Sequence, residues 1–124
     1  MGDIIRPLEA SSEGLVESVK DPTSAEGMIF FHANEGKPLA TPWQVALSRA
    51  ILLNKYSLPD GHILDCACGS GIQVAAYSVI TKRPVLGIEL NPQRARASAV
   101  NFCNIFAQRA EKNLENLSLS LIHI

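Results

Sequence analysis

The chain has 124 residues, which is enough for one small domain. Hydrophobic residues make up 47% of it, so a packed core is expected and wholesale disorder is excluded. With 11 basic and 12 acidic residues the formal net charge is -1. This balance excludes the strong positive charge of a dedicated nucleic-acid binder, but it still allows a local patch that contacts RNA.

Cysteine usage and hydropathy predict a soluble, cytoplasmic protein. The three cysteines, Cys66, Cys68 and Cys103, are odd in number and lack disulfide-framework spacing. Zinc-binding pairs need two to four intervening residues, and only one lies between Cys66 and Cys68, so no metal site is expected. No run is long and apolar enough for a membrane span, and the N-terminus lacks the pattern of a signal peptide.

Residues 1–40 are expected to form an N-terminal extension or part of an upstream segment. The stretch GLVESVKDPTSAEG is compatible with a short helix or a loop, and Met28–Ala33 with a short strand or a packing arm. NEGKPLA then reads as a turn and linker because of its glycine and proline. A helix is predicted next, with Thr41 as N-cap and Pro42 at the first helical position.

A strand, a glycine-rich loop, a helix, a second strand and a further helix are predicted after this leading helix. The leading helix places Trp43, Leu47, Ala50 and Ile51 on one face. HILDCA is predicted as a buried strand, followed by a helix over 71–82 and a strand over 84–90. Asn91 and Pro92 begin the last helix, whose apolar positions are Ala95, Ala99, Phe102, Cys103 and Phe106. This order indicates an α/β fold: the first βαβ unit, with a leading helix, of an incomplete Rossmann-like doubly wound sheet.

The loop DCACGSG, residues 65–71, lies where open α/β sheets bind nucleotides. A triphosphate-binding loop requires a lysine, and none occurs between Asp65 and Thr81. A dinucleotide fingerprint requires a third small residue, where this chain has Val74. Val74 at the third glycine position makes an NAD(P)-dependent oxidoreductase a weaker interpretation, but that function stays open. A non-enzymatic nucleotide-binding module is the other alternative.

Two motifs resemble those of class I S-adenosylmethionine-dependent methyltransferases. Asp65, three spacers and Gly-Ser-Gly resemble motif I, and Glu89 ends the next strand 24 positions later, followed by Asn-Pro. The resemblance covers about residues 63–104 and implies S-adenosyl-L-methionine as cofactor, which has no phosphate and needs no lysine. It implies that Glu89 binds the ribose hydroxyls of the cofactor and that Leu90 lies against the adenine. It also implies that Asp65 lies near the amino-acid end of the cofactor. The full set of implied cofactor-binding residues is Asp65, Ala67, Cys68, Gly69, Ser70, Gly71, Glu89 and Leu90.

The leading helix carries a narrower resemblance. ATPWQVALSRAILL is similar to the start of the corresponding helix in trimethylguanosine-synthase-like and related RNA-guanine methyltransferases. In that case Thr41 and Trp43 would border the cofactor or substrate; otherwise Thr41 is only a cap and Trp43 only core. RNA is therefore the expected methyl acceptor, with a small molecule or a protein as the alternative. His32 and His62 are expected to be structural, because no partner is spaced to orient either ring.

Residues 41–118 are expected to be the cofactor-binding half of a methyltransferase domain, without the acceptor-binding half and therefore inactive alone. The last six residues, LSLIHI, match the translation of a transposon end used in sequencing-library adaptors. They are predicted to be a non-native tail over 119–124, with a natural third strand as the alternative. Catalytic residues are not identified in the sequence.

Overall fold

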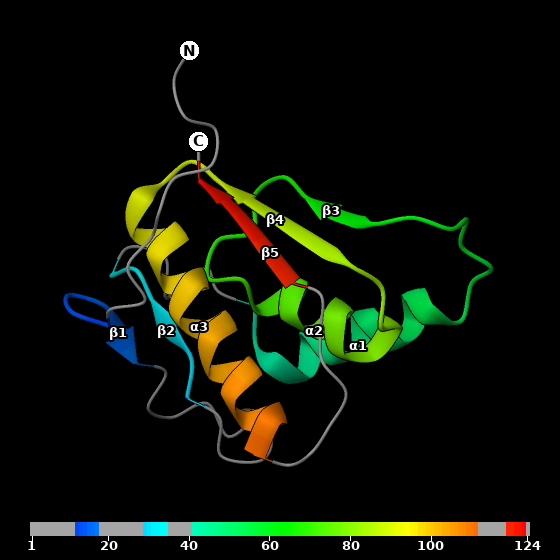
Figure 1. Cartoon of the computed structure of the whole chain (residues 1–124), viewed down its shortest axis with the longest axis horizontal. Helices are drawn as coiled ribbons and strands as arrows, with labels where there is room; N and C mark the ends of the chain where they lie inside the picture. The colour runs from blue at the N-terminus through cyan, green and yellow to red at the C-terminus, as the bar shows by residue number, and fades with distance from the viewer. Residues whose placement is uncertain (1–11, 18–28, 35–40, 112–118, 124) are drawn as a thin grey trace.

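The computed structural model describes residues 12–17, 29–34, 41–111 and 119–123. These residues form a mixed α/β fold with a parallel sheet, an antiparallel ribbon and three helices, so the predicted α/β class is confirmed (Figure 1). The elements are β1 (Val16–Glu17), β2 (Phe31–His32), α1 (Trp43–Asn54), β3 (Ile63–Asp65), α2 (Ile72–Thr81), β4 (Val85–Glu89), α3 (Pro92–Glu111) and β5 (Leu119–His123).

The main sheet has the strand order β3-β4-β5, and both neighbouring pairs are parallel. Val85 of β4 packs with Val74 of α2 and Phe102 of α3 in one cluster, so both helices cover the same face. Leu64 points to the opposite face and is 55% exposed. Strand β3 is therefore half-exposed and not the buried strand that was expected. The described helices cover one face, whereas a doubly wound sheet carries helices on both.

Helix α1 begins one residue later than predicted. Pro42, with φ -59° and ψ 145°, is the N-cap residue, and no side chain caps the helix. The N-cap prediction for Thr41 is therefore wrong. Trp43 and Ala50 are buried as expected, but Ile51 is exposed because the buried stripe runs through Ala46.

Helix α3 begins as predicted. Asn91 accepts hydrogen bonds at Oδ1 from the backbone N–H groups of Gln93 and Arg94, both at 3.0 Å. Its buried face differs from the prediction, since Cys103 and Phe106 are exposed. Buried α3 residues include Ala95, Ser98, Asn101, Phe102 and Ile105. Two polar residues are buried because α3 lies between the sheet and the N-terminal ribbon.

The N-terminal ribbon packs against α3 on the side away from β5 (Figure 1). Strand β1 pairs antiparallel with β2, where a helix or loop was expected around Val16. Phe30, just before β2, is buried in the core against Trp43, with ring centroids 5.3 Å apart. Residues 29–34 thus share a core with 41–111; residues 18–28 and 35–40 lie outside the description.

The C-terminal residues 119–123 form β5, which pairs in parallel with β4 from Val85↔Leu119 to Glu89↔His123. The alternation in LSLIHI therefore does specify a strand, and the adaptor origin of these residues stays a prediction. Among the helices that the structure describes, none combines the length and the apolar character that crossing a bilayer requires.

Candidate functional site

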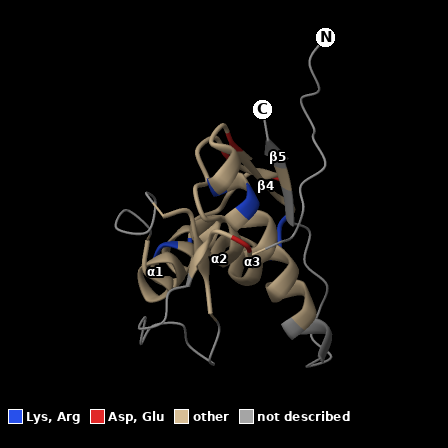
Figure 2. Cartoon of the chain, turned by 90° about the vertical axis from the view of Figure 1, so that its left-hand side faces the viewer, with Lys and Arg blue, Asp and Glu red and all other residues tan. Residues whose placement is uncertain are grey.

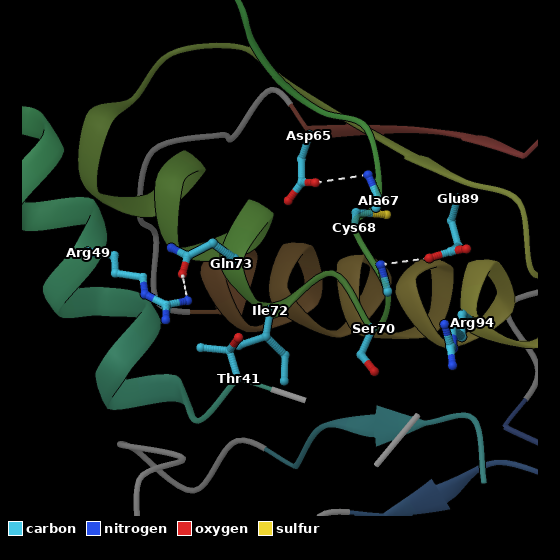
Figure 3. A pocket seen from close by; sticks show the side chains of 11 residues that line it. Thr41, Arg49, Asp65, Ala67, Cys68, Ser70, Ile72, Gln73, Glu89 and Arg94 are labelled. Atoms are coloured by element: carbon cyan, nitrogen blue, oxygen red, sulfur yellow. Dashed lines mark hydrogen bonds between the residues drawn. The ribbon is translucent and has the colours of Figure 1, made fainter. Parts of the chain in front are cut away.

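A cavity of about 420 Å³ opens over the glycine loop, where β3 and β4 end (Figure 3). Its size falls within the range of about 300–1,000 Å³ that small-molecule sites occupy. The carboxyl ends of parallel strands are where open α/β sheets bind ligands. The lining residues are Thr41, Arg49, Asp65, Ala67, Cys68, Gly69, Ser70, Ile72, Gln73, Glu89 and Arg94.

The cavity gathers most of the residues predicted for the cofactor. Asp65, Ala67, Cys68, Gly69, Ser70 and Glu89 line it, and so does Thr41. Gly71, Leu90 and Trp43 are not among the lining residues. Trp43 is a core residue, whereas Leu90 follows Glu89 directly and is 67% exposed, so its contact with adenine stays a prediction.

Backbone hydrogen bonds fix the first half of the glycine loop. Asp65, at the end of β3, accepts a hydrogen bond at Oδ1 from the N–H of Ala67 at 3.1 Å. The N–H of Cys68 donates to the carbonyl of Ile88 in β4 at 3.1 Å. Asp65 therefore does stabilise the turn, but only one of its two oxygens is used for this, and its side chain lines the cavity.

Glu89 joins the loop to the end of β4. Its Oε1 accepts from the N–H of Gly69 and its Oε2 from the N–H of Asn91, both at 2.9 Å. The side chain is only 7% exposed, yet it lines the cavity. A carboxylate has about four acceptor positions, two on each oxygen. One acceptor position on each oxygen therefore remains for a ligand.

The two loop glycines serve different purposes. Gly69 has φ +56°, and a Cβ built there has no atom within 4 Å. Gly71 has φ +80°, and a Cβ there lies 2.5 Å from Cε1 of Phe102 and 3.0 Å from Oγ of Ser98. Gly69 therefore leaves open space beside the cavity, while Gly71 is required by the packing of α3. Gly69 lines the cavity and Gly71 does not, and the expected ligand role of both glycines stays a prediction.

Cys68 lies between the two carboxylates of the site. Burial raises the pKa of its thiol from 9.0 to about 11; a hydrogen bond with Ser98 opposes this, and the charges of Asp65 and Glu89 add to it. The thiol is therefore protonated at neutral pH and is a poor nucleophile. Cys68 packs in one core cluster with Phe102.

Four cavity residues were missed by sequence reasoning: Arg49, Ile72, Gln73 and Arg94. Basic positions lie on α1 and near the start of α3 (Figure 2). Arg49 donates to Oε1 of Gln73 at 3.4 Å, and Gln73 donates to the carbonyl of Ala46 at 3.0 Å. Arg49 and Gln73 lie at one end of the cavity, and Glu89 and Arg94 lie at the other (Figure 3). An arginine in the leading helix was the available signal, but the sequence does not reveal how α1 packs on α2.

His32, for which a structural role was expected, is buried against the glycine loop. It is 3% exposed, and its Nδ1 lies 2.7 Å from Oγ of Ser70. Across the described parts of the chain, no three His, Cys, Asp or Glu residues are grouped so that they could hold a metal ion. No protein-family model, curated protein or solved structure matches the chain.

Proposed function

We propose that this chain binds S-adenosyl-L-methionine as part of a class I methyltransferase with a Rossmann-like doubly wound sheet. The observation that carries the proposal is the pair of carboxylates that line the cavity, Asp65 at the end of β3 and Glu89 at the end of β4, beside a glycine loop that has no lysine. Both side chains line the cavity; burial is the main cause of the raised pKa of the Cys68 thiol, and the two carboxylates add to it. Carboxylates beside a ligand attract a cationic sulfonium and repel a diphosphate.

One end of the cavity suits an α-amino acid. Such a group is a zwitterion and needs a cation and a carboxylate side by side. Arg49 and Gln73 supply donors there, and the second oxygen of Asp65 is available for the ammonium group. This pairing supports a ligand with a methionyl part and gives a dinucleotide no comparable advantage.

The other end suits a nucleoside. Glu89 keeps one acceptor position on each oxygen, which matches the two neighbouring hydroxyls of a ribose. The open space at Gly69 allows a ligand to approach the backbone closely. The exposed side chain of Leu90 is the apolar surface proposed for the adenine.

When bound, the cofactor supplies a methyl group whose bond to sulfur breaks, with the electron pair left on sulfur, as the acceptor nucleophile bonds to carbon and loses its proton. Within this chain the proposed contribution is positioning, which accounts for much of the catalysis in such transfers. The protonated thiol of Cys68 argues against a covalent enzyme step. RNA is the proposed acceptor, on the resemblance of the leading helix alone; a small molecule or protein is the alternative.

A second candidate is an NAD(P)-dependent oxidoreductase. Arg49 and Arg94 line the cavity, and arginines are suited to phosphate groups. Glu89 is equally suited to the ribose of a dinucleotide. A non-enzymatic nucleotide-binding module is the third possibility, and it shares the same cavity.

The test is equilibrium binding of S-adenosylhomocysteine and of NAD to the full chain by calorimetry. We expect saturable binding of S-adenosylhomocysteine and binding of NAD at least about tenfold weaker, a gap of 1.4 kcal/mol. The exposed carboxyl of Asp60, replaced in Asp60→Asn, provides a control that leaves both affinities unchanged. Absence of saturable S-adenosylhomocysteine binding overturns the proposal, and tighter binding of NAD selects the oxidoreductase. Transfer of a labelled methyl group to RNA or to protein, measured with the cofactor present, then identifies the acceptor.

A further inference from the structure

We infer that His32 and Asn101 are positioning residues, which fix Ser70 in the ligand-binding loop and make strand β2 part of the site. The identity of the ligand rests on the function proposed above; the geometry of the loop does not. Ser70 lines the cavity, whereas His32 and Asn101 do not.

Asn101 connects β2 to the glycine loop through one side-chain amide. Its Nδ2 donates to the carbonyl of Ser70 at 2.8 Å and to the carbonyl of Phe31 at 2.9 Å. Its Oδ1 accepts from the N–H of Phe31 at 2.8 Å. The residue is 1% exposed in the middle of α3, where asparagine is a weak helix former. A fully engaged buried amide fixes geometry more specifically than an apolar side chain of similar size.

His32 holds the same loop residue at a second point. Its Nδ1 lies 2.7 Å from the hydroxyl of Ser70, which points toward β2 in Figure 3. Ser70 is thus held at its carbonyl by α3 and at its hydroxyl by β2. One contact restrains the backbone of Ser70 and the other its side chain, so the residue has little rotational freedom.

Helix α3 holds the preceding loop residue in the same way. The hydroxyl of Ser98, three positions before Asn101, donates to the carbonyl of Gly69. Residues three apart lie on one helix face, so α3 presents two polar groups to two consecutive loop carbonyls. The loop is therefore ordered before a ligand arrives, and the entropy cost of ordering it does not reduce the affinity.

A purely structural role for His32, attaching the ribbon to the core, is the competing explanation. Hydrogen–deuterium exchange of the loop amides without ligand separates the two. His32→Leu removes the contact with Ser70, whereas His32→Asn keeps a polar atom near the place of Nδ1. We expect exchange in residues 66–71 to accelerate about three- to tenfold in His32→Leu and to stay near the original rate in His32→Asn.

The control is Ile80→Ala, which removes packing from α2 away from the loop. Equal acceleration of the loop in this control and in His32→Leu, at matched loss of thermal stability, overturns the inference. Failure of His32→Asn to restore the exchange rate also overturns it. Ser70→Ala removes the same contact from the loop side, so it gives the same readout if His32→Leu does not fold.

A double-mutant cycle on the affinity for S-adenosylhomocysteine completes the test. His32→Leu is expected to weaken binding about three- to tenfold in the original chain and to have no further effect beside Ser70→Ala. Additive losses would mean that His32 does not act through Ser70, contrary to the inference. Lack of binding by the unmodified chain contradicts the proposed function instead, and the exchange experiment still decides the role of His32.

Discussion

Replacing Gly71 with alanine is expected to destabilise the fold severely. The added Cβ lies 2.5 Å from Cε1 of Phe102 and 3.0 Å from Oγ of Ser98, and φ is +80°. The left-handed backbone costs about 1–2 kcal/mol for an alanine. Overpacking against buried Phe102 costs about 1–3 kcal/mol more. The expected loss of about 2–5 kcal/mol is large beside the total of about 5–15 kcal/mol for a typical domain.

Urea denaturation followed by circular dichroism measures this loss, and Gly69→Ala is the matched control. Gly69 has φ +56° but no atom within 4 Å of a Cβ, so only the backbone cost of about 1–2 kcal/mol applies. The difference between the two variants therefore isolates the contact with Phe102. Phe102→Leu in the Gly71→Ala background should recover part of the stability. Equal losses in the two glycine variants would refute the reasoning, because the packing of α3 would then not require Gly71.

Three further predictions concern the cavity. Glu89→Gln should raise the Kd for S-adenosylhomocysteine about 10- to 150-fold in calorimetry, since a hydrogen bond to a charged group contributes about 1.5–3 kcal/mol; an unchanged Kd would show that Glu89 is misassigned. Arg49→Met should weaken S-adenosylhomocysteine about tenfold while sparing 5′-methylthioadenosine, which lacks the amino acid, and equal losses would argue against Arg49 at that end. The pKa of Cys68 in the folded protein is about 11, above the ordinary value of 9.0. The buried neutral thiol therefore contributes fully to the free energy of unfolding below pH 9. This contribution, about 3 kcal/mol in total, is lost as the pH rises toward 11. Denaturation across this pH range should show the loss, and the same slope in Cys68→Ala would contradict it.

The elements between 41 and 111 were predictable because their signals are local. Asn91 and Pro92 begin α3 through groups within three residues of one another, and the observed bonds of Asn91 agree. Short apolar runs bounded by turns likewise predict β3 and β4, although not their degree of burial. The positions of Asp65 and Glu89 in the cavity follow from the same local order, since both end neighbouring parallel strands.

The buried face of α3 was misjudged because polarity is not the same as exposure. Ser98 and Asn101 resemble a solvated face in the sequence, yet they are buried where they bind loop carbonyls. Cys103 and Phe106 look like core residues and are exposed. Periodicity cannot show which polar residues have buried partners, because those partners come from distant parts of the chain.

The cavity residues that were missed depend on packing between elements. Arg49 reaches Gln73 only through the way α1 lies on α2, and neither helix encodes that contact alone. The need for glycine at position 71 likewise comes partly from Phe102, about 30 positions away, and not from the left-handed backbone of the loop alone. Local patterns therefore located the loop, while its surroundings required the three-dimensional arrangement.

The hydrogen bonds between Phe31 and Asn101 span 70 positions of the chain. Contacts over such separations form slowly, because a long segment must be closed before they stabilise anything. The units β3–α2–β4 and β4–α3 are connected locally, so β2 is expected to dock last and detach first. Stopped-flow kinetics should then show that variants of His32 accelerate unfolding and leave the folding rate nearly constant. The rigid form of the glycine loop would thus be reached only at the final step of assembly.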